Sequence, residues 1–150
     1  MITIKTGNLL DAEERGIVHQ VNHQGVMGAG LAKQIKRVYP KCFELYKNTC
    51  DNNSWKEIQY FGGVIYYTSS NGKTIVNLFG QRYYGSLHFK ADYEAMRNGF
   101  QTIAKRSIGS TIAIPYGIGC GLGKGNWDIV YDMICEVFKD NDVVIYKLEE

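Results

Sequence analysis

Two glycine-rich segments constrain this sequence more than any other feature. One lies within His19–Gly30 and the other within Pro115–Gly125, and each follows an apolar run and precedes a stretch with helical spacing. Glycine lets backbone N–H groups approach an anion closely, and the N-terminus of a following helix adds partial positive charge. If the two segments lie side by side at one edge of a sheet, they would hold a diphosphate from both sides. The pattern therefore predicts a nucleotide-diphosphate site.

Alternating and helical patterns predict strands and helices in the order β-β-α-α-β-β-α-β-α-β. The predicted strands are Ile2–Thr6, Gly16–Val21, Phe61–Ser69, Thr74–Phe79, Thr111–Ile114 and Val143–Leu148, and the predicted helices are Gly30–Val38, Lys41–Cys50, Phe89–Arg106 and Trp127–Phe138. Asn71-Gly72, between two β-rich runs, signals a hairpin. The order favours a mixed sheet with helices on both faces, and a ligand beyond the carboxyl ends of its central strands.

Length and composition limit the possible partners. With 150 residues, 45% of them hydrophobic, we expect a single domain spanning residues 1–150. The formal charge is +2, and outside the helical cluster of Lys33, Lys36 and Arg37 the longest basic run is Lys105-Arg106, so duplex nucleic acid is not implied. The sequence has neither a charged leader before an apolar core nor an apolar run long enough to span a bilayer. We therefore expect a cytoplasmic chain with no membrane partner.

The cysteines and histidines do not form a metal-binding pattern. They are Cys42, Cys50, Cys120 and Cys135, with His19, His23 and His88. The cysteines include no Cys-x-x-Cys pair, and the histidines do not complete a zinc spacing with them. We expect reduced structural thiols, no metal site and no cofactor.

Two common phosphate-binding motifs do not fit the glycine segments. A Walker A motif ending at Gly123-Lys124 would need glycine at Ile118 and a hydroxyl residue at Gly125. The first segment has the spacing Gly-x-x-Gly-x-Gly, and no acidic residue follows at the position that a Rossmann site requires. Each glycine run taken singly is also compatible with a tight turn alone.

Three separated segments resemble the signature segments of the macro domain. They are Ile2–Leu10, His19–Tyr39 and Ile114–Trp127, and the similarity continues through Val130–Phe138 into the last strand. Within that superfamily the chain resembles the branch that contains the animal terminal ADP-ribose protein glycohydrolase and the yeast ADP-ribose 1''-phosphate phosphatase. The resemblance implies a three-layer α/β/α sandwich with a mixed, mostly parallel central sheet, and an ADP-ribose pocket across its carboxyl edge.

The resemblance also implies a set of binding residues. Asn8 would read the adenine amino group, although it is equally compatible with an Asx-turn after the first strand. Tyr146 would stack on the adenine or pack in the core. Asn22 and His23 would contact the distal ribose. The first diphosphate loop would be Gly28, Ala29 and Gly30, and the second, which also wraps the distal ribose, would be Gly117, Ile118, Gly119, Cys120, Gly121, Leu122 and Gly123.

Catalysis is less strongly indicated. The lysine and aspartate of the animal deglycosylase correspond to Gln81 and Gly123 here, and neither side chain can perform their chemistry. The covalent lysine mechanism is therefore predicted to be absent. His19 matches the histidine of the yeast phosphatase, so it is the candidate catalytic residue, as acid, base or nucleophile. The alternative is a core histidine bonded to a backbone carbonyl.

Two functions of different class follow. The first is a hydrolase of a small ADP-ribose derivative, above all one that converts ADP-ribose 1''-phosphate to ADP-ribose and phosphate, with His19 in the reaction. The second is a module that binds free or protein-linked ADP-ribose without turnover. A buried His19 imidazole directed away from the cleft would favour the second.

Overall fold

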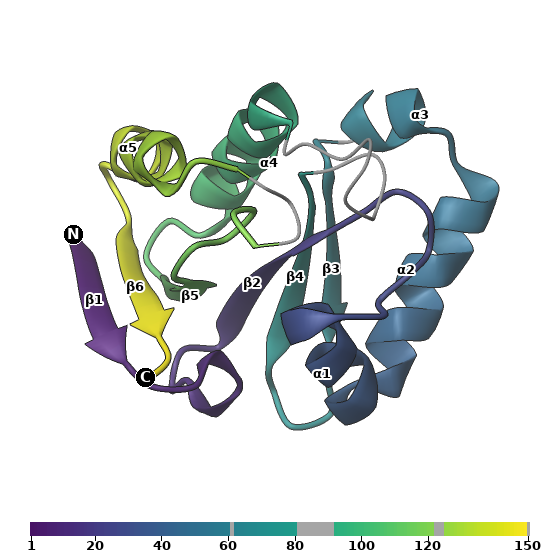
Figure 1. Cartoon of the computed structure of the whole chain (residues 1–150), viewed down its shortest axis with the longest axis horizontal. Coiled ribbons are helices and arrows are strands. Elements are labelled where there is room, and N and C mark those ends of the chain that lie inside the picture. The colour runs from purple at the N-terminus through teal and green to yellow at the C-terminus, as the bar shows by residue number, and fades with distance from the viewer. Residues whose placement is uncertain (61, 81–91, 122–124, 150) are drawn as a thin grey trace.

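The computed structural model describes residues 1–60, 62–80, 92–121 and 125–149. In this part of the chain the strands form a six-stranded sheet in the order β1-β6-β5-β2-β4-β3 (Figure 1). The strands are β1 (Ile2–Thr6), β2 (Gly16–Val21), β3 (Val64–Thr68), β4 (Thr74–Phe79), β5 (Thr111–Pro115) and β6 (Asp142–Lys147). Neighbouring strands are parallel except β3 and β4. The predicted mixed, mostly parallel sheet is confirmed.

The helices follow the predicted order with one addition. They are α1 (Gly30–Val38), α2 (Pro40–Asn52), α3 (Trp55–Tyr60), α4 (Tyr93–Arg106) and α5 (Trp127–Val137). Helix α3 was not predicted from the sequence, because its six residues are too few to display a helical period. Helix α2 starts at Pro40, where the missing N–H costs nothing. Asp92 caps α4 by accepting from the Ala95 N–H at 3.0 Å, and the predicted start at Phe89 lies outside the described residues.

The hairpin predicted from Asn71-Gly72 is confirmed. Strands β3 and β4 pair antiparallel, and the Ser69 N–H donates to the Lys73 carbonyl at 2.7 Å across the turn. Gly72 has φ +88°, a left-handed conformation that glycine adopts without a Cβ penalty. The predicted strand start at Phe61 lies outside the described residues, and β3 begins at Val64.

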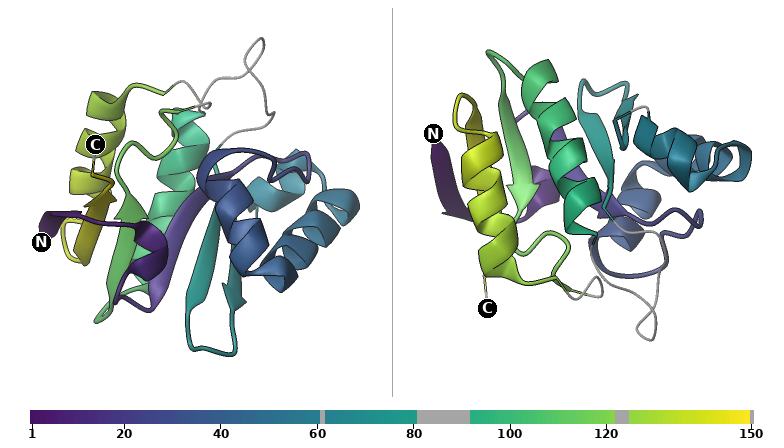
Figure 2. Two further views of the ribbon diagram at one scale, coloured as in Figure 1. Left: turned by 60° about the horizontal axis from the view of Figure 1, so that its bottom comes forward. Right: turned by 90° about the horizontal axis from the view of Figure 1, so that it is seen from above.

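Helices cover both faces of the sheet (Figure 2). On one face α4 and α5 bury Phe100 and Phe138, whose rings meet edge to face at 5.6 Å. On the other face α1 and α2 bury Ile35, Cys42 and Tyr46. The three-layer α/β/α sandwich is therefore confirmed, with an apolar core on each side of the sheet.

The sheet opens between its two central strands. Strand β2 pairs with β5 through only Gly16 and Ile17, and then continues beside β4 as far as Val21. Strand β5 meanwhile continues beside β6 to Pro115, so β2 and β5 separate toward their carboxyl ends (Figure 1). The chain leaves β2 for α1 on one face and leaves β5 for α5 on the other. Such a switch point leaves a crevice at the carboxyl edge, which is where the sequence predicts a ligand.

Three further features concern the described ranges only. All four cysteines are free. No group of three or more histidine, cysteine or acidic side chains is arranged to hold a metal ion. None of the helices combines the length and apolar character needed to cross a membrane.

Candidate functional site

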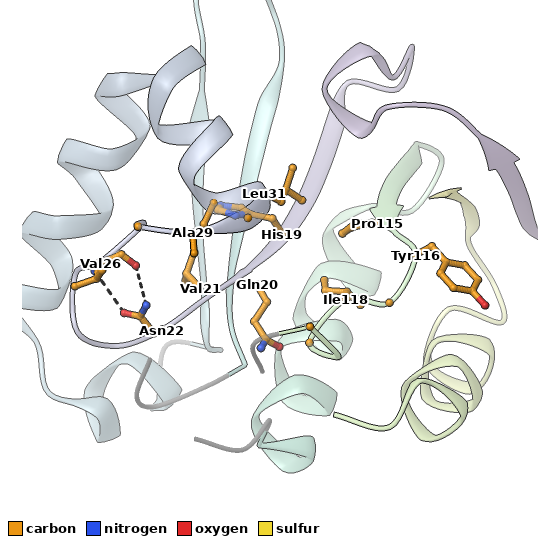
Figure 3. Close-up of a pocket in the computed structure, with 16 residues that line it drawn as sticks. His19, Gln20, Val21, Asn22, Val26, Ala29, Leu31, Pro115, Tyr116 and Ile118 are labelled. Carbon is orange, nitrogen blue, oxygen red and sulfur yellow. Dashed lines mark hydrogen bonds between the residues drawn. The ribbon is translucent and has the colours of Figure 1, made fainter. Parts of the chain in front are cut away.

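A cavity of about 500 Å³ occupies the crevice between β2 and β5 (Figure 3). It is lined by the end of β2 and the loop after it, by the first turn of α1, and by the loop after β5. The predicted site residues that line it are His19, Asn22, Gly28, Ala29, Gly30, Gly117, Ile118, Gly119 and Gly121. The two glycine-rich segments therefore face the same cavity, although almost a hundred residues of sequence separate them.

The first loop presents backbone donors to the cavity. Ala29 is the N-cap of α1 and makes no capping hydrogen bond with its side chain. The Lys33 N–H donates to the Ala29 carbonyl at 3.2 Å, so the N–H groups of residues 30–32 precede the helical hydrogen-bond ladder. These residues line the cavity, and Gly30 has the left-handed φ of +56° that turns the chain into the helix. The helix N-terminus thus offers unpaired donors and partial positive charge to an anion.

The second loop is a tight turn that packs against β2. Gly117 and Gly119 have φ of +77° and +76°, and the Cys120 N–H donates to the Gly117 carbonyl at 2.8 Å. The positive φ of Gly119 favours glycine, and a Cβ there would stand 2.8 Å from Met96 Cε and 2.9 Å from Gln20 Oε1, so the ends of these two side chains would have to shift. A Cβ on Gly117 would meet no atom within 4 Å. The loop is therefore close-packed where it touches β2 and open at Gly117.

The side chain of Asn22 holds the first loop in place through hydrogen bonds to the loop backbone and to α2. Its Nδ2 donates to the Val26 carbonyl at 2.7 Å (Figure 3), and its Oδ1 accepts from the Gln24 N–H at 2.8 Å and the Tyr46 hydroxyl at 2.7 Å. Tyr46 is fully buried in α2. The amide of Asn22 therefore anchors the glycine-rich loop to the neighbouring helix.

His19 lies in the wall of the cavity, but its imidazole is buried. It is on the same face of β2 as Ile17, toward α1 and α2, and is 1% exposed. Its Nε2 lies 2.6 Å from the Oδ1 of Asn77, the residue opposite it on β4. Asn77 donates from Nδ2 to the Ile65 carbonyl at 3.2 Å, which turns its Oδ1 toward His19. The Nε2 therefore carries the proton, and Nδ1 has a bare lone pair.

Burial determines the charge of this histidine. Desolvation lowers the pKa of His19 from 6.5 to about 4, and the hydrogen bond to Asn77 only partly opposes this. The imidazole is therefore neutral at pH 7. Its Nδ1 is buried and has no hydrogen-bond partner within the described part of the chain. At neutral pH the ring has an accepting lone pair at Nδ1. It has no second proton that it could donate as a general acid.

The two predicted adenine contacts, Asn8 and Tyr146, are not among the residues that line the cavity. The Oδ1 of Asn8 accepts from the Leu10 N–H at 3.0 Å, which is the Asx-turn considered as its alternative. The hydroxyl of Tyr146 donates to Glu14 Oε1 at 2.6 Å. Tyr146 pairs in the sheet with Pro115, which does line the cavity, so this ring is one strand away.

The other predicted residues fall outside the wall or outside the described ranges. The Nε2 of His23 is 3.3 Å from the Asn53 carbonyl, and its ring meets Trp55 edge-on at 5.6 Å. The thiol of Cys120 donates to the Ile118 carbonyl at 3.4 Å. The residues that the structure does not describe are Leu122, Gly123 and Gln81.

Sequence reasoning missed the apolar part of the wall. The unpredicted lining residues are Gln20, Val21, Val26, Leu31, Ala32, Pro115 and Tyr116. Four of them, Gln20, Val21, Leu31 and Tyr116, directly follow or precede a predicted site residue, and for these four adjacency was the available signal. Tyr116 is 38% exposed, and its ring contacts Trp127 at a tilt of 45° with ring centroids 4.7 Å apart. It lies at the β5 end of the lining, with its ring directed toward α5 (Figure 3).

No charged side chain lines the cavity in the part of the chain that the structure describes. An anion bound here would be held by backbone N–H groups and by the dipole of α1, and no carboxylate would repel it. The arrangement suits a ligand that combines a diphosphate with less polar groups at each end.

Comparison with known proteins agrees with this geometry. A family model described as Macro domain matches residues 18–134. The chain belongs to this family. The macrodomain of DarG from Mycobacterium tuberculosis has the same fold, with a TM-score of 0.81 and 28% identity over 97% of each chain.

Two curated relatives carry functional names. The "DNA ADP-ribosyl glycohydrolase" of Mycobacterium tuberculosis is 31% identical over 97% of this chain, which spans 42% of that protein's length. An "ADP-ribose 1''-phosphate phosphatase" of Aspergillus clavatus is 38% identical over 52 residues, 34% of this chain and 26% of that protein. The first similarity covers nearly the whole macro domain and the second about a third of it.

The neutral state of His19 generates a testable pH dependence. The unfolded chain takes up a proton on this residue near pH 6.5, whereas the folded chain does so near pH 4. The stabilisation is therefore complete above pH 6.5 and is lost as the pH falls to 4, by about 3 kcal/mol. Urea unfolding of the wild type and of His19→Gln between pH 4 and pH 7 measures it. We expect the wild type to lose more free energy of unfolding than the variant, whereas parallel pH profiles would contradict the buried neutral imidazole.

Proposed function

We propose that the cavity binds ADP-ribose, with its diphosphate between the two glycine-rich loops. The observation that carries the proposal is the convergence of the α1 N-terminus and the Gly117 turn on one cavity without a charged side chain in the described wall. A diphosphate needs several N–H donors at short range, which these loops offer from opposite sides. Membership in the Macro domain family supports the same ligand.

We further propose an orientation for the ligand. The adenine would lie toward Tyr116 and the β5–β6 edge, with Asn8 and Tyr146 at its border. The distal ribose would lie toward Asn22 and the loop that it anchors. The half-exposed ring of Tyr116 supports this assignment, because an aromatic edge suits a base better than a ribose.

We propose that the chain is a hydrolase that acts on a group attached at the 1'' position of the distal ribose. Both named relatives act on ADP-ribose derivatives according to their names, one as a glycohydrolase and one as a phosphatase. The candidate substrates are therefore ADP-ribose 1''-phosphate and ADP-ribose linked to a macromolecule. Because Gln81 replaces the lysine of the animal deglycosylase, we expect no covalent lysine intermediate.

His19 limits how such a hydrolase could work. As a neutral imidazole it could act through Nδ1 as a base or nucleophile, and the wall over the ring would first have to move, because the residue is 1% exposed. The same burial favours a second function, binding of ADP-ribose without turnover. In that case His19 and Asn77 would serve only to support the floor of the cavity.

Hydrolysis can be tested with three substrates in parallel. The wild-type protein is incubated with ADP-ribose 1''-phosphate, with ADP-ribosylated single-stranded DNA and with ADP-ribosylated protein, and release of phosphate and of ADP-ribose is followed separately. We expect turnover of at least one substrate, and a fall of roughly 10²-fold in His19→Ala if the imidazole takes part. Equal turnover in His19→Ala would remove the catalytic assignment of His19. If none of the three substrates gives a product, the hydrolase proposal is wrong, and binding of ADP-ribose without turnover remains.

The proposed diphosphate site can be tested by introducing one carboxylate into either glycine-rich loop. Gly28→Glu and Gly121→Glu should each abolish ADP-ribose binding in calorimetry, because a carboxylate in an anion-binding loop repels the diphosphate. A Cβ on Gly121 meets nothing within 4 Å and one on Gly28 makes only an ordinary contact at 3.5 Å, so the fold should be kept. The matched control is Ser110→Glu, an exposed position that does not line the cavity. Wild-type affinity in a folded Gly121→Glu protein would refute the assignment.

A further inference from the structure

The charges of this chain are distributed unevenly along the sequence. Residues 15–43 contain five basic residues and no acidic one, so the rest of the chain carries a net charge of −3 against a total of +2. Three of the five, Lys33, Lys36 and Arg37, lie on α1. The helix that lines the cavity is therefore also the most basic element of the described fold.

These three cations lie together on the outer face of α1. Ile35 packs into the core on the opposite side, and all three basic side chains are exposed. In the described part of the chain no carboxylate forms an ion pair with any of them. The ammonium of Lys36 lies 4.1 Å from the centre of the Phe43 ring of α2, which holds it on this face. The face is thus a compact, uncompensated positive surface.

This surface is continuous with the cavity. Residues 30–32 of α1 line the cavity, Lys33 is the next residue, and Lys36 and Arg37 follow one turn later. Lys36 and Arg37 therefore lie about one turn, roughly 5 Å, beyond Lys33 on the side away from the anion-binding end of the helix. Helix α1 contains no acidic residue. A polyanion attached to a ligand in the cavity would therefore meet no negative charge of this helix before it reaches the three cations.

We propose that Lys33, Lys36 and Arg37 form a docking surface for the phosphate backbone of a single-stranded nucleic acid that carries the ADP-ribosyl group held in the cavity. The proposal rests on the proposed function and specifies its macromolecular substrate. Three exposed cations on one helix face, without a carboxylate partner in the described part of the chain, suit the negative charge of a phosphate backbone. The similarity to a DNA ADP-ribosyl glycohydrolase over 97% of this chain points to the same partner class. The absence of long basic runs argued only against duplex nucleic acid.

The test compares two triple charge reversals of equal size. The first is Lys33→Glu with Lys36→Glu and Arg37→Glu, and the control is Lys5→Glu with Lys105→Glu and Lys139→Glu, three exposed lysines on β1, on α4 and after α5. Anisotropy measures binding of a fluorescein-labelled single-stranded oligothymidylate between about 50 and about 200 mM salt. We expect the α1 variant to bind at least about tenfold more weakly, with its log–log salt slope reduced by about 2, and the control to change less than about threefold.

Two further measurements distinguish a failure of the docking surface from a failure of the proposed function. Calorimetry with free ADP-ribose should give the same affinity within about threefold for both variants, because the described cavity wall contains none of the altered side chains. Failure of the wild type to bind ADP-ribose would overturn the proposed function, whereas the oligonucleotide measurement tests the basic surface of α1 by itself. Polyglutamate of similar charge tests a protein-like polyanion.

Three results would overturn the docking surface. They are failure of the wild type to bind the oligonucleotide, equal weakening by both variants, and binding of polyglutamate as tight as that of DNA. Circular dichroism of each variant confirms that the comparison is made on folded protein.

Discussion

The separation of β2 from β5 is the constraint on which the site depends. The two strands share hydrogen bonds only at their beginnings, and each then follows its other neighbour. The chain leaves them toward opposite faces, so neither connection can fill the space between their carboxyl ends. The second loop approaches Gln20 closely at Gly119, whose φ of +76° favours glycine. The cavity is thus a result of sheet topology, and the glycines determine how closely its walls approach.

The chemistry of the wall follows from this origin. Because the described lining contains backbone turns and no charged side chain, recognition of an anion would fall to N–H groups and to the dipole of α1. Such donors are fixed by the fold and need no side-chain ordering on binding. The basic side chains lie instead on the outer face of the same helix, beginning at Lys33. In the proposed function, recognition of the diphosphate and attraction of a larger polyanion are therefore assigned to different parts of one helix.

Much of this arrangement could be predicted from the sequence, because its signals are local. The glycine segments and the Asn71-Gly72 turn each lie within a few residues of sequence, and the described part of the structure contains them. The environment of His19 could not be predicted, because its partner Asn77 is 58 positions away and the two meet only through β2–β4 register. Tyr116 was missed for a similar reason: its contact with Trp127 depends on how α5 returns to the sheet. The site positions at Gln81, Leu122 and Gly123 remain predictions from the sequence alone.

The central claim is that backbone donors of both loops bind one diphosphate, and amide NMR tests it most directly. ADP-ribose is titrated into ¹⁵N-labelled protein, with AMP as a ligand that lacks the diphosphate and the distal ribose. The account predicts that the amides of residues 28–32 and of residues 117–121 shift together with one dissociation constant for ADP-ribose, and that AMP reproduces neither set in full. Shifts confined to one loop, or identical shifts with AMP at equal affinity, would contradict it.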